Sequence, residues 1–143
     1  LHKAIRRQRQ MCIRDRDVEI YQMLADDIKS GRNEYVDSKS LSDLYEEKVG
    51  AKSPIHRYHV LRADEPSTTI ISHLDRDGNR FIHYDPEQGR DITPREAARI
   101  QSFDDDFDFI GNQTDTYIMI GNAVPPLLAK CVGLAVSEVL DIL

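Results

Sequence analysis

The residues best placed to bind a ligand form the run Gly121-Asn122-Ala123-Val124-Pro125-Pro126, near the end of the chain. Paired prolines favour the first positions of a helix, so we expect a turn at Gly121-Asn122 and a helix from Pro125 onward. A helix start leaves backbone N–H groups free, and Asn122 adds a side-chain amide. Such a turn is suited to an anionic or polar ligand, although a helix start without a ligand has the same pattern.

The other candidate residues do not form a catalytic or metal-binding set. Cys131 lies in an apolar helical pattern and Cys12 in the basic N-terminal run, so neither is predicted to be a nucleophile. The acidic run 104–108 does not fit a calcium-binding loop, because Phe109 stands where such a loop needs glycine. His56 and His59 have no further ligand set nearby. We therefore predict no catalytic residue and no metal site in this chain.

The run Thr93-Pro94-Arg95-Glu96 predicts the start of another helix. It combines an N-cap threonine, a proline at the first helical position and a glutamate three residues after the cap. We expect this helix to end near Ser102. Arg95 and Arg99 are four residues apart and share one face. Two roles stay open for them: contact with nucleic-acid phosphates, or ion pairs with Glu96 and the acidic loop that follows.

The elements around these residues follow from their periodicity. Apolar spacing predicts helices over 17–30 and 40–48, and a last helix to Ile142 whose wide apolar face needs partners on more than one side. Residues 58–61, 68–74 and 80–84 read as short strands, the second of them rich in β-branched residues. A turn at Asp77-Gly78 predicts that the last two strands form a β-hairpin.

The composition is that of an ordinary globular protein. Of the 143 residues, 40% are hydrophobic and 31% charged. No apolar run is predicted to cross a bilayer, because charged residues interrupt the C-terminal helix, so we expect no membrane partner.

Two distant cysteines favour a reduced, cytoplasmic setting. The formal net charge of −6 argues against indiscriminate binding to duplex DNA, which depends on clustered Lys and Arg.

The first sixteen residues differ from the rest, with six Lys or Arg and a single Asp. One interpretation is a basic arm that binds nucleic acid. The alternative is a non-native leader over residues 1–16, because the run from Arg9 to Arg16 resembles translated sequencing-adapter read-through. We adopt the second interpretation and leave this segment out of the fold.

Four segments together resemble one enzyme family. Residues 90–103 and 121–126 resemble the ninth and tenth conserved blocks of the DNA cytosine-5 methyltransferases, in the same order and at the same separation. Residues 64–70 and 77–86 resemble the end of that family's target-recognition domain. The resemblance covers residues 17–143 and is densest from Pro66 onward. One departure is Asp104, where the family usually has proline.

The resemblance implies an α/β fold, namely the C-terminal part of a Rossmann-like methyltransferase. It divides the chain into a helical segment at 17–53 and the C-terminal part of the target-recognition domain, with the β-hairpin, at 54–92. The block-nine helix and loop follow at 93–120. The cofactor-side turn and the C-terminal helix, at 121–143, return to the catalytic domain.

The family's binding residues carry over at six positions. By resemblance, Asn122, Ala123 and Val124 line the pocket for the methyl donor S-adenosyl-L-methionine. Thr69 stands where the recognition domain offers a threonine to the backbone of double-stranded DNA, although a strand residue without a contact is the other interpretation. Arg95 and Arg99 are expected to contact DNA or to clamp the recognition domain.

The family's Pro-Cys catalytic loop, Glu-Asn-Val block and glycine-rich cofactor loop are absent from this sequence. The family has them upstream, so we expect a fragment that lacks the catalytic half, needs that half as its partner and is inactive alone. The parent reaction would be methyl transfer to carbon 5 of cytosine in DNA, in restriction–modification or another role. The alternative is a non-catalytic DNA-binding or complementing subunit that acts with a partner chain.

Overall fold

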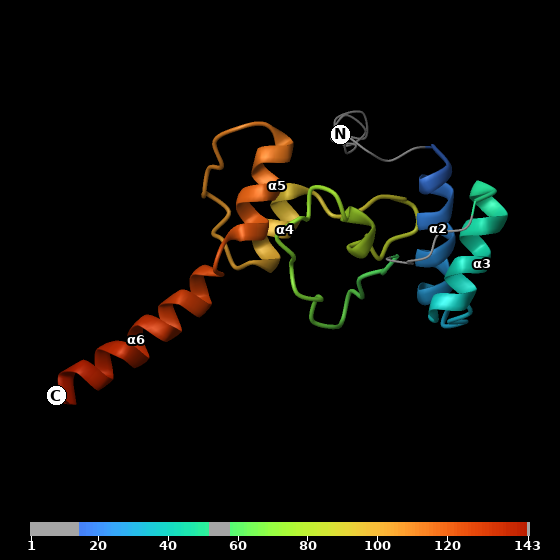
Figure 1. Cartoon of the computed structure of the whole chain (residues 1–143). Coiled ribbons are helices and arrows are strands. Elements are labelled where there is room, and N and C mark those ends of the chain that lie inside the picture. The colour runs from blue at the N-terminus through green and yellow to red at the C-terminus, as the bar shows by residue number, and fades with distance from the viewer. Residues whose placement is uncertain (1–14, 52–57, 143) are drawn as a thin grey trace. The chain divides into compact units, whose positions relative to one another are not determined.

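The computed structural model describes residues 15–51 and 58–142 (Figure 1). Their helices are α2 (Asp15–Ser30), α3 (Ser38–Val49), the 3-10 helix η1 (Gly78–Arg80), α4 (Pro94–Ile100), α5 (Gln113–Asn122) and α6 (Pro126–Ile142). The chain divides into two compact units. The first is Leu1–Thr68 with Asp77–Thr93, and the second is Thr69–Arg76 with Pro94–Leu143.

Helices α2 and α3 pack side by side in the first unit (Figure 1). Both confirm the predicted helices and begin two residues earlier than expected. The α3 start is explained by Asp37, whose carboxylate accepts the N–H groups of Lys39 and Ser40 at 2.8 and 3.0 Å. Residues at three- and four-residue spacing bury one face of each helix, and the buried set is Ile20, Tyr21, Leu24, Ala25, Leu41 and Leu44.

The predicted β-hairpin is wrong for this structure. Residues 68–71 are neither helix nor strand, residues 72–76 form turns, and η1 occupies the place where the returning strand would begin. The β-type contacts of the described residues are isolated bridges instead. Ile82 pairs with Val60 in parallel and with Asp91 in antiparallel fashion. The fully buried Phe81 and Ile82 show why this segment reads as a strand, since burial alone produces the same apolar pattern.

Helices α4 and α5 pack together in the second unit (Figure 1). Helix α4 begins at Pro94 as predicted, and the capping role of Thr93 stays a prediction. It ends at Ile100, where Ser102 adopts a left-handed backbone with φ of 62°. The N–H of Ser102 donates to Arg99 O and that of Phe103 to Ala98 O, both at 2.9 Å. This is a Schellman motif, formed here with serine at the position that usually holds glycine.

Helix α5 occupies the position where the sequence predicted a turn at Gly121-Asn122. Asn112 and Asp115 form a capping box, because each side chain accepts the backbone N–H of the other. Tyr117 and Ile120 then bury one face of the helix. The helix therefore continues through Gly121 and Asn122, and the turn begins only at Ala123.

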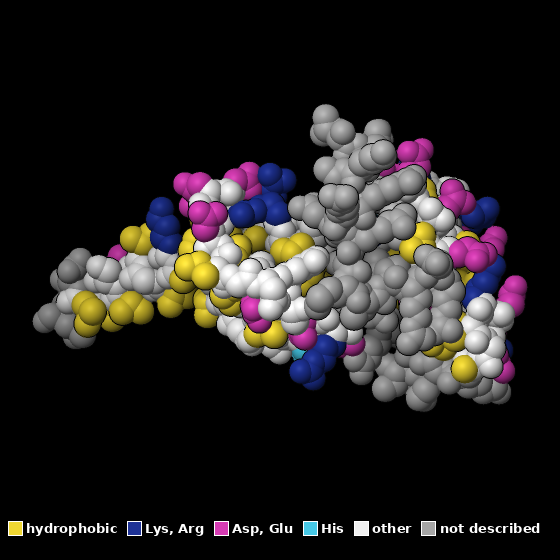
Figure 2. Space-filling model, turned by 90° about the horizontal axis from the view of Figure 1, so that it is seen from above, with side chains coloured by type: hydrophobic (Ala, Val, Ile, Leu, Met, Phe, Trp, Pro, Cys, Tyr) yellow, Lys and Arg dark blue, Asp and Glu magenta, His cyan; other side chains and the backbone are white. Residues whose placement is uncertain are grey.

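Helix α6 packs against none of the other described helices and leads away from α4 and α5 (Figure 1). Its apolar side chains are exposed along its length (Figure 2). By length and composition alone the stretch Gln113–Leu140 could cross a membrane, which corrects the sequence-based statement that no apolar run is long enough. This is weak evidence for a membrane, because a core helix of a soluble protein that lacks its partners has the same features.

Some sequence predictions fall outside the described residues. They are the proposed leader up to residue 14, the break at Ser53-Pro54, and His56. Asp15 and Arg16, counted with the leader in the sequence, form the first two residues of α2.

Candidate functional site

The turn between α5 and α6 is built differently from the predicted helix start. Gly121 and Asn122 end α5, so their backbone N–H groups belong to that helix. In α6, Pro126 has no N–H group, and the N–H of Leu127 donates to the hydroxyl of Ser102 at 3.2 Å. The proposed row of free N–H groups is therefore largely absent here, and the argument for an anion at this helix start is corrected.

The turn nevertheless lies open at the surface of the second unit. Asn122 is exposed, and Val124 is 64% exposed beside it. Asn122 is exposed, and among the described residues no hydrogen bond engages its side-chain amide, so both the donor and the acceptor are available to a ligand. A polar amide next to an exposed apolar side chain can bind a ligand with a polar edge and an apolar face.

The turn is fixed from the side of α4. Gln101 is buried, at 8% exposure, and its Nε2 donates to Ile120 O at 3.0 Å and to Ala123 O at 3.5 Å. These carbonyl groups lie in the last turn of α5 and at its C-cap, where carbonyl oxygens lack partners within the helix. No local sequence signal predicts this role, because a glutamine at a helix end does not reveal its hydrogen-bond partner.

Gly121 is required by a close approach of backbone. A Cβ at this position would lie 2.5 Å from Ile71 O and 3.0 Å from Ser72 O. The segment Thr69–Arg76 therefore passes directly beside the end of α5 within the second unit. Only glycine leaves room for that approach.

Arg95 and Arg99 both contact the loop that follows α4. Arg99 forms a bidentate ion pair with Asp105, with distances of 2.7 and 2.9 Å. Arg95 donates to Asp104 O and Phe107 O and lies 5.9 Å from the centre of the Phe109 ring. Of the two roles left open by the sequence, the structure displays the contact with the acidic loop.

The charge state of this pair follows from its geometry. Hydrogen bonding to Arg99 holds the pKa of Asp105 below its ordinary value. The same bond raises the pKa of Arg99. The ring centres of Phe103, Phe107 and Phe109 lie 4.8–5.1 Å apart, and this aromatic cluster anchors the loop.

Thr69, the predicted DNA-contacting residue, is exposed, and its neighbour Ile70 is buried. It lies in the second unit together with the turn and both arginines. The structure thus places all six predicted binding residues in one unit. Their contacts with a cofactor or with DNA stay predictions.

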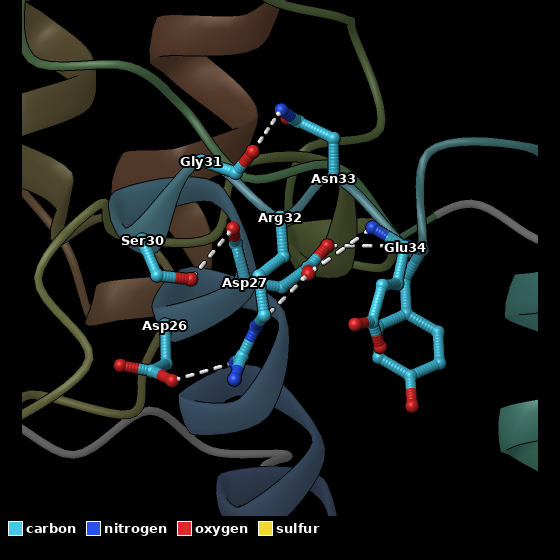
Figure 3. Close-up of polar contacts among 8 residues, drawn as sticks. Asp26, Asp27, Ser30, Gly31, Arg32, Asn33 and Glu34 are labelled. Atoms are coloured by element: carbon cyan, nitrogen blue, oxygen red, sulfur yellow. Dashed lines mark hydrogen bonds and ion pairs between the residues drawn. The ribbon is translucent and has the colours of Figure 1, made fainter.

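The first unit contains a buried carboxylate that the sequence analysis missed. Asp27 is 1% exposed, and its two oxygens accept the N–H groups of Glu34 and Tyr35, each at 3.1 Å (Figure 3). Its backbone oxygen accepts the N–H of Arg32 at 3.2 Å, next to Gly31 with φ of 74°. One aspartate therefore shapes the whole loop from α2 to α3. An acidic residue on the apolar side of a helical pattern was the available signal.

A groove of about 700 Å³ also lies in the first unit, between α2 and the segments around Leu61 and Tyr84. Two basic residues line it, Lys29 and Arg62, against the three acidic residues Asp64, Asp85 and Glu87. Lys29 is already 3.8 Å from Asp85. Because acidic residues outnumber basic ones in its lining, the groove does not favour phosphate binding.

Comparison with known proteins shows the family. The model of the C-5 cytosine-specific DNA methylases matches residues 3–138. The type II methyltransferase M.Bpa9945I of Bacillus paralicheniformis is 37% identical over 129 residues, which are 90% of this chain and 28% of that protein. The DNA (cytosine-5-)-methyltransferase M.ApeKI of Aeropyrum pernix is 41% identical over 85 residues, 59% of this chain and 17% of that protein.

The similarity extends to animals. DNA (cytosine-5)-methyltransferase 1 of Mus musculus is 49% identical over 80 residues, 56% of this chain and 5% of that protein. No solved structure matches the chain. The chain belongs to the C-5 cytosine-specific DNA methylase family, as its sequence motifs predicted. It spans less than a third of the length of these relatives.

Proposed function

We propose that this chain acts as the C-terminal part of a DNA cytosine-5 methyltransferase, which transfers a methyl group from S-adenosyl-L-methionine to carbon 5 of cytosine. The observation that carries the proposal is the exposed Asn122 beside the turn 123–126, in a segment that resembles the family's tenth block and is hydrogen-bonded by Gln101, directly after α4. The proposed setting is the cytoplasm, in a restriction–modification system such as the type II relatives suggest.

The residues of the turn fit the cofactor. Asn122 offers an unengaged amide that can both donate and accept, and Val124 offers an exposed apolar surface. A nucleoside has a polar edge and an apolar face, so this donor set matches its chemistry. In our proposal Asn122, Ala123 and Val124 form one wall of the pocket. When bound there, S-adenosyl-L-methionine supplies the electrophilic methyl group.

On the DNA side, we assign a backbone contact to Thr69 and phosphate contacts or a supporting role to Arg95 and Arg99. The hydrogen bonds of both arginines with the loop 104–107 favour the supporting role. Direct contact of Arg99 with a phosphate would replace its exposed pair with Asp105. Solvent screens exposed ion pairs, so they contribute little to stability and this exchange costs little.

The apolar surface of α6 favours a partner for this chain. Leu127, Leu134, Val136, Val139 and Leu140 are each more than half exposed. In our proposal the catalytic half of the enzyme covers this helix, and that half contributes the nucleophilic cysteine. The match covers only 28% of M.Bpa9945I, so most of that polypeptide lies outside the part that this chain resembles, which leaves room for such a half.

The test joins this chain to the part of M.Bpa9945I that it does not match. We expect the hybrid to incorporate labelled methyl groups into duplex DNA, and the lone chain to incorporate none. In the hybrid, Asn122→Asp should weaken S-adenosyl-L-methionine binding measured by calorimetry. Asn33→Asp, the same change on an exposed loop of the first unit, is the matched control.

Two results would contradict the proposal. Unchanged cofactor affinity in Asn122→Asp would remove the cofactor role of the turn. A folded hybrid without cofactor affinity would reject the assignment of this chain as part of the pocket. Supplying the chain as a separate polypeptide distinguishes a complementing subunit from a covalently joined domain.

A further inference from the structure

We infer that Gln101 and Ser102 are positioning residues for the turn 123–126, the part of the chain to which the proposed function assigns the cofactor. The inference therefore rests on that function for its ligand. Its structural part, that these two side chains fix the turn, stands on the contacts described below. The sequence motifs assign neither residue to the cofactor pocket.

The two residues hold the two ends of the turn separately. The amide of Gln101 donates to Ile120 O at 3.0 Å and Ala123 O at 3.5 Å, which fixes the end of α5. The hydroxyl of Ser102 accepts the N–H of Leu127 at 3.2 Å, which fixes the first turn of α6. Two adjacent side chains thus set the spacing between α5 and α6.

The hydrogen bond between Leu127 and Ser102 connects the first turn of α6 to the rest of its unit. Helix α6 packs against none of the other described helices, and its apolar side chains are exposed. The N–H of Ala123 donates to Ile120 O at 3.3 Å, within the same turn. Because little else restrains the direction of α6 within the described unit, the Ser102 contact has a large share in setting it.

The backbone of Ser102 supports this role. Its φ of 62° is unusual for a residue with a side chain, and glycine would adopt it with less strain. Serine at this position provides the hydroxyl acceptor that glycine lacks. The N–H of Leu127 would otherwise be one of the unpaired donors at the start of a helix.

Gln101 is suited to its position because it donates to carbonyl groups without carrying a charge. It is buried, so a lysine or arginine in its place would bring an uncompensated cation into the interior. Glutamate has the same shape but would place a carboxylate against two carbonyl oxygens. The chemistry of the site therefore selects an amide donor.

The first experiment uses the 143-residue chain and needs no cofactor. Amide hydrogen exchange is measured for Ala123 and Leu127 in Gln101→Met, which keeps length and apolar bulk but removes the donor, and in Ser102→Gly. The N–H of Ala123 donates to Ile120 O and that of Leu127 to the Ser102 hydroxyl, so we expect roughly tenfold faster exchange at Ala123 in the first variant and at Leu127 in the second. The control is Gln113→Met, at the opposite end of α5, which should leave both amides unchanged.

Ser102→Gly separates positioning from folding. Glycine relieves the left-handed backbone, so the chain should melt at the same or a higher temperature while the Leu127 amide exchanges faster. Unchanged exchange at Leu127 would overturn the role of Ser102, and unchanged exchange at Ala123 would overturn that of Gln101. Both results are independent of whether the chain binds S-adenosyl-L-methionine.

The second experiment tests the ligand in the hybrid with M.Bpa9945I. Gln101→Met and Ser102→Gly should raise the KM for S-adenosyl-L-methionine roughly tenfold while the KM for DNA and kcat at saturating cofactor stay near the parent values. Gln101→Glu should lose affinity in the same way at neutral pH. It should recover affinity in mild acid, where the protonated carboxyl group donates again.

The outcomes distinguish the inference from the proposed function. If the KM values for S-adenosyl-L-methionine and for DNA rise equally and kcat falls as well, Gln101 and Ser102 have a general structural role. That result would overturn the inference. If Asn122→Asp leaves cofactor affinity unchanged while the turn amides still respond to Gln101→Met, the proposed function fails and the positioning contacts remain.

Discussion

The Ile71 carbonyl oxygen lies 2.5 Å from the point where a Cβ at Gly121 would stand. A helical position normally gains stability when glycine becomes alanine, by up to about 1 kcal/mol. Here the added methyl group would meet backbone atoms of Ile71 and Ser72, which cannot rotate away. We therefore expect Gly121→Ala to destabilise the second unit by about 1–3 kcal/mol.

The measurement is urea unfolding of the chain followed by circular dichroism at 222 nm, since the protein contains no tryptophan. Gly133→Ala is the matched control, because nothing lies within 4 Å of a Cβ at that glycine of α6. The control should be neutral or stabilising. A Gly121→Ala variant as stable as the parent would show that Ile71 does not approach α5 in solution.

Replacing Asp27 should open the loop between α2 and α3. Asp27→Ala leaves the N–H groups of Glu34 and Tyr35 without their acceptor and removes a nearly fully buried carboxylate. We expect a loss of about 1–3 kcal/mol of stability, measured by urea unfolding. Asp26→Ala removes an exposed pair with Arg32, at 2.8 Å, and should cost no more than about 1 kcal/mol. Equal losses in the two variants would contradict the structure.

The pair of Arg99 and Asp105 should show a defined dependence on pH. Hydrogen bonding to Arg99 lowers the pKa of Asp105, so the stabilising ion pair is complete above the ordinary aspartate pKa. It is lost as the pH falls through the lowered pKa of the folded state. Arg99→Gln should raise the Asp105 pKa toward its ordinary value, observed by NMR of the carboxyl carbon.

The control for this titration is Arg76→Gln, which breaks a different ion pair, between Arg76 and Asp75 at 3.4 Å in the same unit. It should leave the Asp105 titration unchanged. The same midpoint for Asp105 in the parent and in Arg99→Gln would show that the two side chains are not paired in solution.

The exposed face of α6 should make the lone chain self-associate. Leu134 and Val136 are 57% and 52% exposed, and apolar patches of this kind on a free helix promote association. We expect the apparent mass from light scattering to rise with protein concentration, and the double variant Leu134→Gln with Val136→Gln to shift the chain toward the monomer. Ser137→Gln on the same helix is the control and should not change the mass. A parent chain that is monomeric at all concentrations would refute this expectation.

The sequence predicted those features whose signals are local. Caps, apolar spacing and the motifs gave α2, α3, α4 and α6, and also the family. The predicted hairpin was wrong because a strand pattern in residues 80–84 reflects burial of Phe81 and Ile82, and burial does not specify a partner. The length of α5 was missed because the Asn112–Asp115 capping box was not weighed as a helix start.

The candidate site was predicted only in part for a similar reason. The motif predicted an exposed Asn122 next to a turn before the last helix. The hydrogen bonds that hold this turn, in contrast, join residues about twenty positions apart. The residues next to Gln101 and Ser102 in the sequence do not predict the hydrogen-bond partners of these two side chains. Side-chain hydrogen bonds between distant backbone segments depend on tertiary structure, which one sequence does not reveal.

The bond from Gln101 to Ile120 has a consequence for how such enzymes exchange parts. A recombination junction anywhere between Gln101 and Ile120 takes this donor and its acceptor from different parents, and a junction within residues 77–93 separates Ile71 from Gly121. Mosaics of related genes should accordingly have their breakpoints upstream of Thr69, so that the second unit is inherited as an intact cassette.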